Sequence, residues 1–140
     1  MASFLSHPFF RELMSLQLDR ENFAIAGSGP LFARGWIDDP SDIDVVARGS
    51  AWEAATQLGK VVPAPYSDVR HVTLFDGDID ILNGWFPERW SVDYLIDEAD
   101  VICDLRFVRL DIIAATKHML ARPRDLIHIG IIAERTQQEP

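Results

Sequence analysis

The sequence contains one cysteine, few basic residues and no long apolar run. Its 140 residues include only Cys103, which excludes an internal disulfide and favours a reducing compartment. Lys and Arg number 13 against 22 Asp and Glu, a net charge of −9. That charge excludes a protein that holds bulk duplex DNA through a basic face, and it disfavours an anionic membrane surface.

Other signals are missing too. No apolar run approaches the ~18 residues of a membrane-spanning helix. The N-terminal stretch lacks the basic and apolar regions of a secretory signal, so we expect a cytoplasmic protein with no membrane association. The histidines show no metal-ligand spacing, and no Gly-Lys-Ser/Thr follows the Gly-Ser-Gly-Pro turn at 27–30, which excludes a Walker A loop.

What remains is the composition of one folded domain. Apolar residues make up 48% and charged residues 25% of the chain, so we expect a single domain over residues 1–140. Hydrophobic periodicity and turn residues predict an α/β or α+β fold, a mixed sheet flanked by helices. The predicted strands are 23–26, 42–47, a small one at 61–62, a hairpin over 71–82 with a turn at Asp76-Gly77, and one within 101–108. The predicted helices are 8–18, a short one through 31–33, 50–58 with Ser50 near the N-cap, an irregular one within 87–100, 110–121 and 123–135.

The acidic residues carry the chemistry. Asp42 and Asp44 lie two apart on a predicted strand, hence on one face and roughly 6.5–7 Å apart. Asp80 has the same relation to Asp78 on the second arm of the hairpin. If that arm pairs beside the first strand, a third carboxylate reaches the same place, where Mg²⁺ or Mn²⁺ would remove the repulsion and assist phosphoryl displacement. We favour Asp80, which has a firm strand context, and keep Asp78 as the alternative because it adjoins the Gly77 turn.

A second feature is the turn at Gly27-Ser28, between a strand and a helix. Free N–H groups at a helix start, a glycine without Cβ and the Ser28 hydroxyl make a possible phosphate cradle. Arg34, close by in sequence, could reach the same phosphates. Taken alone, each of these features is also ordinary turn or surface chemistry.

Together, Gly27-Ser28, the Asp42-Ile43-Asp44 run and a later strand acid at Asp80 resemble the nucleotidyltransferase superfamily with its polymerase β-like fold. The C-terminal stretch, with Lys117 and Ala121-Arg-Pro-Arg-Asp125, resembles small bacterial members of the AbiEii-like and minimal nucleotidyltransferase groups. The matches cover about residues 23–130.

The resemblance implies a domain that binds a nucleoside triphosphate such as ATP. Asp42, Asp44 and Asp80 would be its metal ligands and catalytic acids, and Gly27, Ser28, Arg34, Lys117 and Arg124 its nucleotide-binding residues. One departure is His128, where the family segment usually has an Asp. The acceptor hydroxyl is left open (protein, RNA end or small molecule), and a homo-oligomer or partner chain could complete the site.

Two other functions stay open. The domain could be a catalytically silent binding module, such as a component of a toxin–antitoxin pair, or a metal-dependent phosphoesterase. The lack of clustered histidine ligands makes the phosphoesterase the least favoured of the three.

Overall fold

The computed structural model describes residues 3–65 and 68–137. It shows an α+β fold around a mixed sheet of seven described strands, which confirms the predicted fold class. The sheet order is β3-β4-β5-β2-β1-β7-β6. The strands are β1 (Phe23–Ala26), β2 (Ile43–Ala47), β3 (Val62–Pro63), β4 (Arg70–Leu74), β5 (Ile79–Leu82), β6 (Asp100–Ile102) and β7 (Leu105–Phe107).

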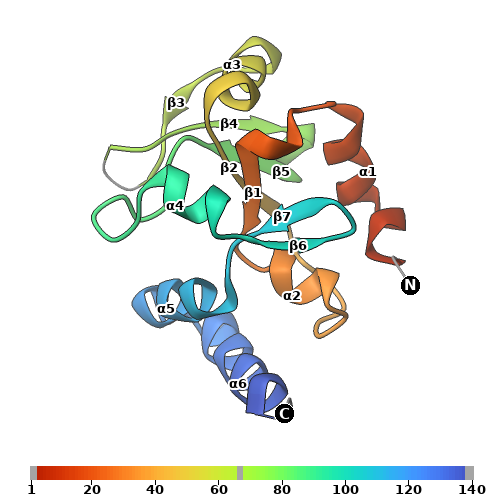
Figure 1. Cartoon of the computed structure of the whole chain (residues 1–140), viewed down its shortest axis with the longest axis vertical. Coiled ribbons are helices and arrows are strands. Elements are labelled where there is room, and N and C mark those ends of the chain that lie inside the picture. Colours follow the sequence, from red (N-terminus) through yellow and green to blue (C-terminus); the bar gives the residue numbers. More distant parts are fainter. Residues whose placement is uncertain (1–2, 66–67, 138–140) are drawn as a thin grey trace.

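Helices cover both faces of this sheet. They are α1 (Pro8–Ser15), α2 (Gly29–Ala33), α3 (Gly49–Leu58), α4 (Val92–Asp97), α5 (Leu110–Leu120) and α6 (Pro123–Gln137), with 3₁₀ turns at Ser3–Ser6, Arg20–Asn22 and Phe75–Gly77. In Figure 1, α5 and α6 lie at one end of the molecule and α3 at the other. No helix in the described ranges is long and apolar enough to span a membrane.

The alternation of side chains along each strand divides the core into two layers. Odd-numbered strand residues such as Ile25, Val45 and Ile81 pack in the layer that includes residues of α1 and α3. Even-numbered residues such as Ala26 and Val46 pack in the layer that includes residues of α4, α5 and α6. Strands that are apolar on both faces are typical of a sheet with helices on both sides.

Two turns differ from the prediction. The strands of the β4–β5 hairpin end at the Leu74–Ile79 pair, so its loop has four residues instead of two. Phe75 and Asp76 are both left-handed, with φ of 54°, and Asp78 is helical with φ of −63°. The single strand predicted within 101–108 is instead a second hairpin, β6–β7, whose two turn residues, Cys103 and Asp104, both have positive φ.

Ser50 lies near the N-cap of α3, as predicted, but does not itself cap the helix. The cap residue is Arg48, and the Ser50 hydroxyl donates a hydrogen bond to the Asp19 carboxylate at 3.2 Å. Helix α4 is also shorter than predicted, because Ser91 caps it at Tyr94 N and the preceding residues form turns. Strand β2 begins one residue later than predicted, which places Asp42 just before it.

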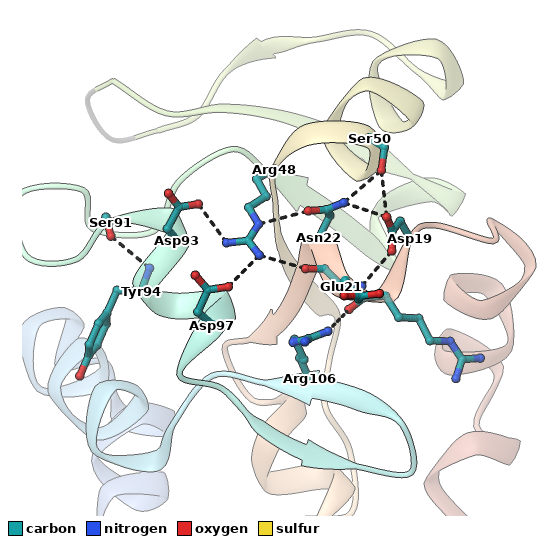
Figure 2. A network of polar contacts seen from close by, with 11 residues as sticks. Asp19, Glu21, Asn22, Arg48, Ser50, Ser91, Asp93, Tyr94, Asp97 and Arg106 are labelled. Carbon is teal, nitrogen blue, oxygen red and sulfur yellow. Dashed lines mark hydrogen bonds and ion pairs between the residues drawn. The ribbon is translucent and has the colours of Figure 1, made fainter.

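Arg48 connects the end of β2 to two other elements (Figure 2). Its guanidinium donates to the carboxylates of Asp93 at 2.9 Å and Asp97 at 2.8 Å, both on α4. It also donates to the Asn22 side chain at 3.2 Å and the Glu21 carbonyl at 3.1 Å. One side chain therefore joins α4 and the turn before β1 to the strand that carries Asp44.

We predict that Arg48→Met lowers the free energy of unfolding by about 1–3 kcal/mol, since several charge-assisted bonds are lost together. The matched control is Arg109→Met, which removes an exposed ion pair to Asp111, two residues away, and should change the stability little. Urea unfolding of both variants measures the difference. Equal small losses would show that the Arg48 contacts contribute no more than an ordinary surface pair.

Candidate functional site

Three carboxylates lie on the layer covered by the C-terminal helices. Strands β2 and β5 are parallel neighbours, and Asp44 is the register partner of Asp80. The row across the sheet reads Ala26, Asp44, Asp80 and Thr73, all on one face. Asp42, two residues before Asp44, lines the same cavity as both. The strand pairing on which the sequence argument depended is therefore present.

The cavity has a volume of about 500 Å³, within the usual range for small-molecule sites. Its lining combines charged side chains with apolar and aromatic ones. Its lining residues are Asp42, Asp44, Asp80, His71, Arg122, Arg124, Pro65, Leu82, Trp85, Phe86 and Leu120. A smaller recess shares Asp42 and Asp44 and extends to Gly27, Ser28 and Lys117.

Burial and mutual repulsion act on the acids. Burial, followed by the charges of Asp42 and Asp80, raises the pKa of Asp44 to about 7. Burial also raises the pKa of Asp42, partly opposed by the charge of Arg124. Within the described chain, no hydrogen-bond donor contacts the side chain of Asp42 or Asp44. Partly buried carboxylates without donors are the kind of group that a divalent cation stabilises.

The donor set fits Mg²⁺ or Mn²⁺ in chemistry: carboxylate oxygens on adjacent strands with no protein donor between them. Among the described residues, however, no three His, Cys, Asp or Glu side chains already converge closely enough to hold an ion. Small side-chain rotations about the Asp42, Asp44 and Asp80 backbones would have to accompany binding.

Gly27 allows the turn after β1 to approach Asp44. Its φ is +63°, and a Cβ built there would lie 2.5 Å from Asp44 Oδ2. The turn leads into the short helix α2, and the Ser28 carbonyl accepts from the N–H groups of Leu31 and Phe32. A side chain at position 27 would therefore have to displace the Asp44 carboxylate.

Ser28 belongs to a buried polar group with residues of α5 and α6. Lys117 Nζ donates to Ser28 Oγ at 3.2 Å and lies 3.6 Å from Asp125 Oδ1. His128 Nδ1 lies 3.4 Å from the same hydroxyl. The Lys117 side chain is 4% exposed, so it points inward beside the recess and does not extend to the surface. Burial lowers its pKa, and the charge of Asp125 opposes this effect.

The other predicted residues divide between two places. Arg124 lines both cavities and donates to Ser41 Oγ at 2.6 Å. Arg34 is not brought to the acids: it donates to the Pro30 carbonyl and pairs with Asp100 at 3.0 Å. It lines a different cavity, with Phe4 and Phe32.

Asp78 also faces another part of the fold. It lies near Glu12 of α1, and burial, followed by the carboxylate of Asp78, raises the pKa of Glu12. Its helical backbone removes it from the strand alternation. The electrostatic neighbours of Asp42 and Asp44 include Asp80. The geometry therefore favours Asp80 as the third acid.

Sequence reasoning did not single out His71 or Phe86, and it named Arg122 only within the Ala121–Asp125 segment. Arg122 bonds Asp125 Oδ2 at 2.6 Å and lines both cavities. His71 Nδ1 lies 2.8 Å from Asp80 Oδ1. A signal for His71 existed: a two-residue turn at 76–77 and the observed four-residue loop both pair Thr73 with Asp80, which places His71 diagonally beside it.

Comparisons with known proteins give no match, neither to a family model nor to a curated protein nor to a solved structure.

We predict that Gly27→Ala destabilises the protein more than Gly35→Ala. Both glycines have positive φ, so each alanine costs about 1–2 kcal/mol in backbone strain. Only the Cβ at position 27 meets Asp44, whereas nothing lies within 4 Å of one at position 35. In an Asp44→Ala background, the Gly27→Ala penalty should fall to that of Gly35→Ala. Unfolding titrations of the double-mutant cycle measure this, and an unchanged penalty would contradict the contact.

We predict that His128 makes stability fall with acidity. Burial, then the charge of Lys117, lowers its pKa from 6.5 to about 4, so the unfolded state binds the proton first. The free energy of unfolding should therefore decrease as pH falls from about 6.5 to about 4. Asp44, with its raised pKa, acts in the opposite direction over much of this range. The measurement is therefore the difference between wild type and His128→Asn across pH; a pH-independent difference would contradict the prediction.

Proposed function

We propose that the protein is a metal-dependent nucleotidyltransferase that moves a nucleoside monophosphate from an NTP to a hydroxyl acceptor. The observation that carries the proposal is the Asp44–Asp80 register pair. Asp42 lines the same cavity, and so do the basic side chains of Arg122 and Arg124. Carboxylates beside cations suit Mg²⁺ with a polyphosphate, because the metal satisfies the acids and the arginines the phosphates.

Bound Mg²⁺ or Mn²⁺ would neutralise the carboxylates and withdraw charge from the transferred phosphoryl group. The chain's own residues would bind and orient. Arg122 and Arg124 supply positive charge to the phosphate oxygens, and Gly27 leaves its backbone open to them. Lys117 supplies further charge behind Ser28.

The reaction forms a bond between the acceptor oxygen and the α-phosphorus and breaks the bridging bond to the β-phosphate, so pyrophosphate leaves. Asp80 would take the proton of the acceptor hydroxyl. Its Oδ1 accepts from His71, and no described hydrogen bond occupies Oδ2. Rate enhancement would come from positioning and charge neutralisation, without a covalent intermediate.

The acceptor remains a protein, an RNA end or a small molecule, and a second copy or a partner chain could complete the site. The apolar side chains of Trp85, Phe86 and Leu120 in the lining offer stacking or packing area to a substrate. We place the protein in the cytoplasm, where the exposed thiol of Cys103 stays reduced.

A second candidate is a catalytically silent module of the same fold, such as a component of a toxin–antitoxin pair. It is favoured by the lack of three converging metal-ligand side chains within residues 3–65 and 68–137. Such a protein would keep the cavity and bind a partner without turning over nucleotide.

We predict that α-³²P label, but not γ-³²P label, is transferred from an NTP to an acceptor in the presence of Mg²⁺ or Mn²⁺. Asp44→Asn and Asp80→Asn should each reduce transfer by at least about 100-fold, a loss of roughly 2.7 kcal/mol in transition-state stabilisation. Asp76→Asn, an exposed acid of the same hairpin, is the matched control and should keep wild-type transfer. Release of the γ-label as phosphate without α-transfer would indicate a phosphoesterase.

Thermal unfolding separates binding from catalysis. A saturating NTP with Mg²⁺ should stabilise the wild type by RT ln(1 + [L]/Kd), about 2.7 kcal/mol at a hundredfold Kd. Asp44→Asn should lose this shift yet keep or slightly gain stability without ligand, since one repelling charge is removed. Equal shifts in both proteins would contradict the proposed site, and no shift in either would favour the silent module.

A further inference from the structure

His71 lies on β4, next to the strand that carries Asp80. The register pairs Thr73 with Asp80 and His71 with Leu82, so His71 is the diagonal neighbour of the acid on the same face. Its Nδ1 is 2.8 Å from Asp80 Oδ1, and its side chain is 16% exposed. Thr73 Oγ1 lies 3.5 Å from the same oxygen. Both contacts from β4 thus fall on Oδ1.

The chemistry of the two groups determines which one donates in the hydrogen bond between His71 Nδ1 and Asp80 Oδ1. An ionised carboxylate only accepts, so His71 Nδ1 carries the proton and donates it to Asp80 Oδ1. A carboxylate turns easily about its last torsion, and a hydrogen bond to one oxygen fixes that torsion. The second oxygen is then presented in one orientation, on the row shared with Asp44.

We propose that His71 is the positioning residue of Asp80, and that its Nδ1–H fixes the carboxylate so that Oδ2 is available to the metal and the acceptor hydroxyl. This inference rests on the proposed function, and it adds a residue that acts through Asp80. Outer hydrogen bonds of this kind commonly change metal affinity by about 10–100-fold.

Two amide substitutions test the bond itself. In His71→Asn the amide nitrogen is attached to Cγ, as Nδ1 is, and it can still donate to Asp80. In His71→Gln the same amide lies one bond further out, near the place of Nε2, and misses the carboxylate. His118→Asn, on the exposed surface of α5, is the control for a histidine change away from the cavity.

The readout is Mn²⁺ binding to the full chain without nucleotide, followed by isothermal titration, with circular dichroism to verify folding. We expect His71→Gln to weaken Mn²⁺ binding about tenfold or more, and His71→Asn and His118→Asn to stay within about threefold of wild type. High Mn²⁺ should restore nucleotidyl transfer in His71→Gln. Equal affinity of His71→Gln and wild type, or equal losses in both amide variants, would overturn the inference and leave the proposed function standing.

The tautomer of His71 can be measured in the wild-type protein, so this test does not depend on whether the variants fold. In ¹⁵N spectra of the wild-type imidazoles, His71 should carry a proton on Nδ1; a proton on Nε2 alone would overturn the inference. Wild-type protein that binds no Mn²⁺ and transfers no nucleotide would overturn both proposals, and the two failures are thereby distinguishable.

Discussion

The arrangement of this molecule depends on the placement of like-charged carboxylates side by side in a sheet. Asp44 and Asp80 are register partners on parallel strands, and Asp42 adds a third negative charge at the same cavity. Burial and repulsion together raise the pKa of Asp44 to about 7, so ionising this acid is costly in the free protein. The proposed cation would relieve that cost, and its binding would then be linked to folding at this row.

Basic side chains line the recess that Asp42 and Asp44 also line. Although the whole chain has a net charge of −9, Lys117, Arg122 and Arg124 all come from the α5–α6 region on the same side of the sheet. Asp125 keeps Arg122 and Lys117 in place: it accepts from Arg122 at 2.6 Å and lies 3.6 Å from Lys117. A buried acid of this kind orients basic side chains whose own flexibility would otherwise cost binding energy.

The sequence alone was enough to locate most elements and the acid row, because both depend on local alternation. Asp44 and Asp80 each lie between apolar neighbours, and that pattern determines which face they share. Local alternation could not show that Asp78 and Arg34 lie away from the candidate site. Asp78 leaves the strand pattern through a helical backbone and a contact with Glu12, and Arg34 is held by Asp100, 66 residues away. Contacts between distant segments have no local signature, so the sequence could not exclude either residue.

The buried serine shows how a tertiary contact changes the meaning of a motif. Gly27-Ser28 has the composition of a phosphate turn, yet the Ser28 hydroxyl already contacts Lys117 and His128. Because the pKa of His128 is lowered to about 4, its ring is neutral near pH 7 and can accept the hydroxyl proton, while Lys117 donates to the oxygen. Ser28 then serves to hold Lys117 beside the recess, and in the proposed site the Gly27 backbone is what remains to approach a phosphate. His128 makes this arrangement possible, since an ionised carboxylate at its position would attract the lysine away from the hydroxyl.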